Sequence, residues 1–201
     1  IGEADRLVTF FTREEGLIRV IAKGVRKIPS SRGGHLEPCT LVSATLHESK
    51  SRHQGEQGAV YMSKVETEDY FHSLREDADA FTRACGHIQL FQKLFDTTQS
   101  APEIFDALLA TWRLYPSLSQ EKRITVDASL ALQIIQYAGL MPDTRLWNAT
   151  VKDTSLAVIK YLSENPSHAP RIALSVEDAL RVQRGMRDVL AQALSEPSMI
   201  Y

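Results

Sequence analysis

A stretch rich in positively charged residues separates two segments that have the composition of β-strands. It extends from Lys23 to His35, contains glycines and serines, and has no acidic residue. Its four permanent cations are Lys23, Arg26, Lys27 and Arg32. Such side chains release condensed counterions when they bind a nucleic-acid backbone, and a glycine-rich chain can approach an anion closely. The run therefore predicts a phosphate-binding loop, and a merely solvated charged loop is the equal alternative.

Three arginines on the adjoining segments could extend this positive field. They are Arg6, Arg13 and Arg19. Arg13 and Arg19 flank the turn Glu14-Glu15-Gly16, so ion pairs with these acids are the competing interpretation. The three arginines extend the field if they share a face, and together with the four cations of the loop they make up the predicted DNA-binding residues.

Aromatic residues near the basic run offer a second kind of contact. Domains that bind single strands usually stack bases on such rings, and Phe10, Phe11 and Tyr61 are the candidates for base stacking. Successive strand residues point to opposite faces, so one of Phe10 and Phe11 must face the core. A structural role for both rings, with the second covered by helices, is the alternative.

No pattern in the sequence supports catalysis. The six histidines lack metal-binding spacing, and neither a G-x-S-x-G elbow nor a G-x-x-x-x-G-K-[ST] loop occurs. We therefore expect no enzyme activity, no catalytic residue and no cofactor. Cys39 and Cys85 each lie within an apolar pattern, so we expect small buried side chains rather than metal ligands or a disulfide framework.

The elements that would position these residues follow from the hydrophobic period. Short alternating segments bounded by turn residues predict strands at about 6–13, 17–23, 36–47 and 59–65. The period then changes to that of a helix. Helices are predicted from a Ser73–Glu76 capping box to Phe95, and at about 102–115, 120–138, 155–163 and 176–194. In the last helix, the predicted buried residues are Val176, Leu180, Met186, Leu190 and Leu194.

These segments predict an α+β protein with two domains. Residues 1–66 would form a small antiparallel β-barrel and residues 67–201 an all-α domain. The formal net charge is −2. Residues 1–65 hold 10 Lys and Arg against 7 Asp and Glu, a balance of +3, and the remainder holds 13 against 18, a balance of −5. This asymmetry is typical of a nucleic-acid-binding module on an acidic scaffold.

The sequence also predicts where in the cell the protein is located. It contains no apolar run long enough to cross a bilayer and no secretory signal, so the cytoplasm is expected. The chain begins without methionine on a segment that resembles entry into a strand. We therefore expect residues to precede Ile1.

Four short motifs in order resemble the N-terminal oligonucleotide-binding (OB) domain of the RecO family. They are Gly2–Arg6, Phe11–Arg19, Ala22–Lys27 and Gly34–Pro38. A weaker resemblance continues through Ser73–Asp77, Pro102–Leu109 and Ala138–Pro142.

The resemblance implies a cytoplasmic, nucleoid-associated mediator of DNA recombination and repair. Such a protein binds single- and double-stranded DNA, anneals complementary strands, and works with RecR to load RecA onto DNA covered by single-strand-binding protein. The Lys23–Arg32 loop would contact DNA, and Arg6, Arg13 and Arg19 would line the same barrel. A helical protein-interaction scaffold whose barrel binds no nucleic acid is the alternative.

The chain departs from the family pattern in two respects. Many members carry a zinc module with four cysteines after a Gly-Leu-x-Pro segment, whereas Met141–Trp147 contains no cysteine. We therefore expect no zinc. The first strand of the family's barrel would lie before Ile1.

Overall fold

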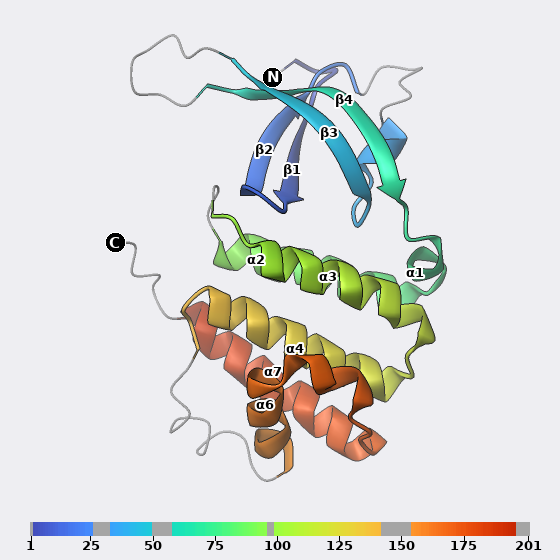
Figure 1. Ribbon diagram of the computed structural model, residues 1–201, viewed down its shortest axis with the longest axis vertical. Helices are drawn as coiled ribbons and strands as arrows, with labels where there is room; N and C mark the ends of the chain where they lie inside the picture. Colours follow the sequence, from blue (N-terminus) through green and yellow to red (C-terminus); the bar gives the residue numbers. More distant parts are fainter. Residues whose placement is uncertain (1, 26–32, 50–57, 96–98, 142–153, 196–201) are drawn as a thin grey trace. The chain divides into compact units, whose positions relative to one another are not determined.

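The computed structural model describes residues 2–25, 33–49, 58–95, 99–141 and 154–195 (Figure 1). The chain divides into two compact units. Ile1–Cys85 and Asp96–Phe105 form the first, here called the sheet unit. Gly86–Phe95 and Asp106–Tyr201 form the second, the helical unit. The predicted α+β class is confirmed, with a sheet followed by helices.

The sheet has four strands in the order β1-β2-β4-β3. Their bounds are β1 (Arg6–Thr12), β2 (Gly16–Ala22), β3 (Leu41–Glu48) and β4 (Val60–Asp69). β1 with β2 and β3 with β4 are antiparallel pairs. β2 and β4 pair in parallel, which joins the two hairpins into one mixed sheet.

The inner face of the sheet forms a hydrophobic core. Its buried members are Val20, Ala22, Val25, Leu36, Met62 and Val65, and partly buried residues including Val8 and Phe10 pack against them. Leu36 comes from the short 3-10 helix η1 (Gly33–Leu36). Because side chains alternate along a strand, the residues between these positions point to the outer face.

Six α-helices are described. They are α1 (His72–Glu76), α2 (Ala78–Leu94), α3 (Pro102–Leu114), α4 (Gln120–Tyr137), α6 (Thr154–Glu164) and α7 (Val176–Ser195). The predicted bounds are confirmed to within a few residues, except that the first helix is divided. Asp77 is extended, and its Oδ1 accepts a hydrogen bond of 3.0 Å from the Ala80 N–H. The predicted Ser73–Glu76 capping box was wrong, because α1 begins after Phe71 without a side-chain cap.

The core of the helical unit is built around α4. Leu130, Leu132, Ile134 and Ile135 in this helix are buried. The Thr125 hydroxyl donates to the Ala169 carbonyl oxygen over 3.1 Å, so a buried polar group on α4 is paired. None of the described helices has the length and apolar character needed to span a membrane.

The buried face of α7 differs from the predicted one. Val176, Leu180 and Leu194 are 61%, 46% and 44% exposed, so their predicted burial was wrong, whereas Met186 is buried. The buried stripe instead runs through Ala179, Val182, Met186 and Val189. These positions keep helical spacing but lie on a different face from Val176 and Leu180, and hydrophobic period alone did not distinguish the two faces.

Candidate nucleic-acid interface

Strand register aligns four side chains across the outer face of the sheet. Leu7 is opposite Ile21, Ile21 is opposite Tyr61, and Tyr61 is opposite His47. We call these four residues the cross-strand row. Their strand neighbours, such as Val20 and Met62, belong to the core on the inner face. The row therefore points away from the core on all four strands.

The row presents apolar and aromatic surface to solvent. Leu7 is 52% exposed. Ile21 and Tyr61 are half-buried, and His47 is exposed. Rings and flat apolar side chains at the surface of a small sheet are surfaces on which bases can stack.

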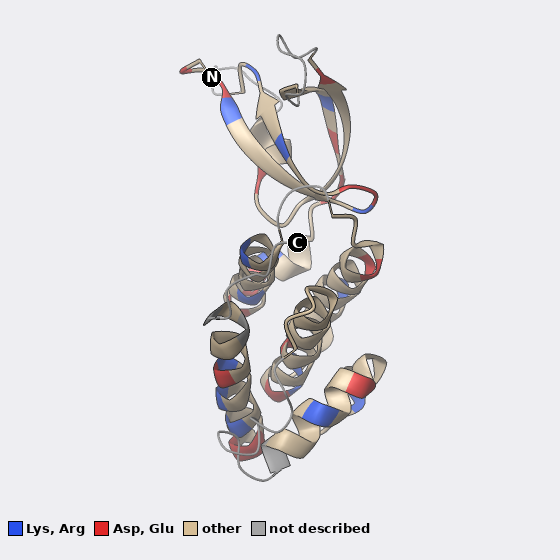
Figure 2. Cartoon of the chain, turned by 90° about the vertical axis from the view of Figure 1, so that its left-hand side faces the viewer, with Lys and Arg blue, Asp and Glu red and all other residues tan. Residues whose placement is uncertain are grey.

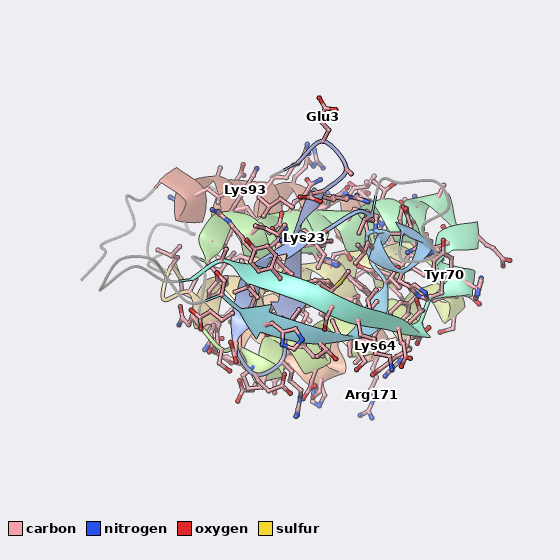
Figure 3. The ribbon with its side chains drawn as sticks, turned by 90° about the horizontal axis from the view of Figure 1, so that it is seen from above. Glu3, Lys23, Lys64, Tyr70, Lys93 and Arg171 are labelled. Atoms are coloured by element: carbon pink, nitrogen blue, oxygen red, sulfur yellow. The ribbon has the colours of Figure 1, made fainter. Side chains whose placement is uncertain are left out.

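Two cations lie beside the middle of the row. Lys23 directly follows β2, is exposed, and places Nζ 4.5 Å from the centroid of the Tyr61 ring. A cation at this distance is attracted by the electrons of the ring face. Arg19 is exposed and lies two residues before Ile21, so it shares the outer face of β2. Positive charge and stacking surface therefore occur together. Lys23 is labelled in Figure 3.

The imidazole at the β3 end of the row is held by neighbouring groups. His47 Nε2 lies 2.9 Å from Ser63 Oγ, and the Ser63 hydroxyl lies 3.2 Å from the Thr45 carbonyl oxygen, to which it donates. Both contacts form together when the Nε2–H of His47 donates to Ser63 Oγ and the Ser63 hydroxyl donates to Thr45. These bonds fix the orientation of the ring at the surface.

The start of the basic loop is anchored by Asp5. Its Oδ1 accepts a hydrogen bond of 2.9 Å from the Gly24 N–H, and Oδ2 accepts one of 3.0 Å from the Gly2 N–H. The bond from Gly24, then that from Gly2, and to a lesser degree the charge of Lys23, lower the pKa of Asp5. Gly24 has a φ of 68°, which glycine adopts without strain. Asp5 thus fixes the backbone beside Lys23.

The other predicted cations do not join this group within the described residues. Arg6 shares a face of β1 with Val8 and Phe10, opposite the cross-strand row. Arg13 lies in the turn between β1 and β2, where its carbonyl oxygen accepts a bond of 3.4 Å from the Ser100 hydroxyl. Three further predicted cations lie outside the described residues, namely Arg26, Lys27 and Arg32.

Two of the predicted rings have partners within the sheet unit. Phe10 packs against the core. Phe11 makes an edge-to-face contact with Phe105, with ring centroids 5.5 Å apart. Tyr61 is thus the predicted ring that lies in the cross-strand row. Of the predicted site residues, the structure brings together Arg19, Lys23 and Tyr61.

Sequence reasoning missed Leu7, Ile21 and His47 as members of the site. The alternation of Ala44 and Leu46 with polar residues was a signal that His47 points outward. That alternation fixes the face of one strand only. The cross-strand row also depends on the register between neighbouring strands, which alternation within one strand does not predict.

Charges of both signs are distributed over the described elements (Figure 2). Lys64 and Glu66 both lie on β4, and Lys64 Nζ is 2.8 Å from Glu66 Oε1. Both side chains are mostly exposed. The hydrogen bond from Lys64, and then its charge, lower the pKa of Glu66. Lys64 is therefore a useful comparison for Lys23, since its charge already has an acidic partner. Among the described residues, no three His, Cys, Asp or Glu side chains gather as a metal site.

Taken together, the mixed four-stranded sheet and the helices that follow define an α+β protein with an OB-like N-terminal domain. Residues 1–59 match the family model described as recombination protein O, N-terminal. This segment spans the first three strands and ends before β4. Over these residues the chain is thus similar to the N-terminal domain of the RecO family, which supports a relation to proteins of DNA recombination and repair.

Proposed function

We propose that this chain is a recombination mediator without catalytic activity. It would bind single- and double-stranded DNA, anneal complementary strands, and act with RecR to load RecA onto DNA covered by single-strand-binding protein. Its place would be the nucleoid in the cytoplasm. The observation that carries the DNA-binding part is the cross-strand row, with Arg19 and Lys23 beside it. The match to the recombination protein O domain supports the cellular role.

The chemistry of the row suits an annealing protein. Such a protein must hold a strand while its base edges stay free to pair. Lys and Arg contact phosphates, which carry no sequence information, and a ring or apolar side chain contacts the flat face of a base. Neither contact uses the hydrogen-bonding edge of the base. The arrangement therefore favours sequence-independent binding of a strand that can still be paired.

Fluorescence anisotropy with a short labelled single strand tests the binding. Affinity should fall steeply between low and moderate salt, because each phosphate contact releases counterions. Replacing Lys23, Arg26 and Lys27 together by Ala should remove most of the affinity, whereas Lys64→Ala should not. Salt-insensitive binding, or an unaffected triple variant, would contradict the proposal. A strand-annealing assay with the same variants then tests the activity itself.

A second candidate function is a protein-interaction scaffold whose sheet does not bind nucleic acid. It is favoured by Val176 and Leu180, which lie one turn apart on α7 and are 61% and 46% exposed. Under this alternative, oligonucleotides bind no better than an unrelated polyanion such as heparin. A competition titration between the two polyanions therefore separates the two functions.

A further inference from the structure

Two cysteines that are distant in sequence meet in the sheet unit. Cys39, just before β3, places Sγ 3.7 Å from Sγ of Cys85 in α2, and both thiols are free. A disulfide has an S–S distance of about 2.05 Å. A further approach of less than about 2 Å would therefore bring the sulfurs to bonding distance. Side-chain rotation and small backbone shifts provide movements of this size.

The position of Cys39 is set by its backbone and by Arg75. Cys39 has a φ of 55°, in the left-handed region that is unfavourable for residues with a Cβ. The Arg75 guanidinium donates to the carbonyl oxygens of Pro38 and Cys39 over 2.5 and 3.4 Å, and to Thr40 Oγ1 over 2.8 Å. These bonds hold the strained segment in place. They keep the Cys39 thiol next to α2.

The two thiols differ in their surroundings. Cys39 is 8% exposed, whereas Cys85 is half-buried. Burial, and then the neighbouring Cys85, raise the pKa of Cys39 to about 12. Cys39 therefore remains a protonated thiol at neutral pH, and a thiol reacts far more slowly with an oxidant than a thiolate does. Cys85 is also the thiol that a small oxidant in solution can reach more easily.

We propose that Cys39 and Cys85 form a reversible oxidation site for hydroperoxides. The Cys85 sulfur attacks the distal peroxide oxygen, the O–O bond breaks, and the Cys85 thiol proton passes to the remaining oxygen, which leaves as an alcohol, or as water from hydrogen peroxide. Cys85 is thereby oxidised to a sulfenic acid. The Cys39 sulfur then attacks the Cys85 sulfur, the S–S bond forms and the S–O bond breaks. The hydroxide leaves with the Cys39 proton as water.

The product would be a disulfide that ties the segment before β3 to α2 inside the sheet unit. The bond closes a loop that contains β3, β4 and α1. Such a closed loop restricts the unfolded chain, so the oxidised sheet unit should resist unfolding more than the reduced one. A dithiol such as dithiothreitol would reverse the reaction by thiol–disulfide exchange.

Treatment of the dilute full chain with hydrogen peroxide tests the site. The intact mass should fall by two hydrogens, a proteolytic peptide pair should contain Cys39 linked to Cys85, and dithiothreitol should restore the original mass. The apparent melting temperature should rise by roughly 4 °C or more. Linkage between molecules, or the absence of the internal disulfide under conditions that oxidise the thiols, would overturn the proposal.

Single variants test the order of the two steps. In Cys39→Ala the reaction should stop at a sulfenic acid on Cys85, which dimedone traps. In Cys85→Ala, dimedone labelling of Cys39 should be at least about tenfold slower, because Cys39 is a buried thiol. Equal labelling of both variants would contradict the assigned order. A time course on the wild-type chain, with dimedone added early, gives the same information if a variant does not fold.

Discussion

The ammonium nitrogen of Lys23 lies 4.5 Å from the centroid of the Tyr61 ring. Lys23 follows β2 and Tyr61 lies in β4, so the contact joins the two hairpins at their parallel pairing. The lysine is exposed and the ring is half-buried. A charge that can contact a phosphate and a ring that can stack on a base are therefore adjacent on one face of the sheet.

Replacing Lys23 by Ala should weaken single-strand binding and reduce its salt dependence. One phosphate contact on a single strand contributes about 0.7 to the slope of log K against log salt concentration, so the slope should flatten by about this amount. Lys64→Ala should leave the slope unchanged, since Lys64 pairs with Glu66. Anisotropy titrations at several salt concentrations measure both slopes. Equal slopes for wild type and Lys23→Ala would mean that Lys23 contacts no phosphate.

Replacing Tyr61 should separate stacking from charge. Tyr61→Ala should cost about 1–3 kcal/mol of binding free energy, the amount typical for one stacked base. Tyr61→Phe should keep most of the affinity, because the ring face remains, and the salt slope of both variants should stay near that of wild type. Anisotropy gives the affinities, and circular dichroism checks that each variant is folded. Similar affinities for Tyr61→Ala and Tyr61→Phe would exclude stacking on this residue.

Local patterns predicted the elements and part of the candidate site. Alternation placed Phe10 and Phe11 on opposite faces of β1, and the structure has Phe10 in the core and Phe11 against Phe105. The cross-strand row could not be predicted in the same way. It depends on the parallel pairing of Ile21 with Tyr61, and this register is set by packing between segments that are far apart in sequence.

Two other features were not predicted from the sequence, because they too depend on tertiary contacts. Cys39 and Cys85 looked like two unrelated apolar positions, because their sequence separation conceals the contact between their thiols. Val176 and Leu180 have the spacing of a buried face, yet α7 buries Ala179 and Val182 instead. Hydrophobic spacing shows that a helix has an apolar side, and the packing of its neighbours decides which residues that side includes.

Replacement of Arg75 should destabilise the sheet unit. Its Nε donates to the Tyr70 carbonyl oxygen over 2.8 Å, its guanidinium carbon lies 4.0 Å from the Tyr70 ring centroid, and its other bonds hold the segment before β3. Arg75→Lys loses the planar fork and should lower the free energy of unfolding by about 1–3 kcal/mol. Urea denaturation of the full chain measures the change.

A matched control for this prediction is Arg181 on α7. Arg181 pairs with Glu177 at 2.6 Å on an exposed helix face. Arg181→Lys should change the free energy of unfolding by no more than about 0.5 kcal/mol, as expected for an exposed pair one turn apart. If Arg75→Lys lowers the free energy of unfolding no more than Arg181→Lys does, the bonds of Arg75 do not determine the stability of the sheet unit.

The carboxylate of Asp5 should stabilise the start of the basic loop in a pH-dependent way. Hydrogen bonds from Gly24 and Gly2 lower the pKa of Asp5 below its ordinary value of 3.8. A lowered folded-state pKa means that the stabilisation is complete above the unfolded-state value and is lost as the pH falls through the folded-state value. The difference in melting temperature between wild type and Asp5→Ala should therefore be constant from neutral pH to about pH 5 and shrink in stronger acid.

Asp5→Asn tests whether the charge itself is responsible for that pH dependence. The amide keeps an acceptor oxygen for the Gly24 N–H but does not ionise in this range. Its melting temperature should lie between those of wild type and Asp5→Ala at neutral pH. As the pH falls through the folded-state pKa of Asp5, wild type should approach Asp5→Asn, because a protonated carboxyl group and an amide offer similar neutral acceptors. A wild-type advantage that persists unchanged into acid would show that the shape of the side chain, and not its charge, holds the loop.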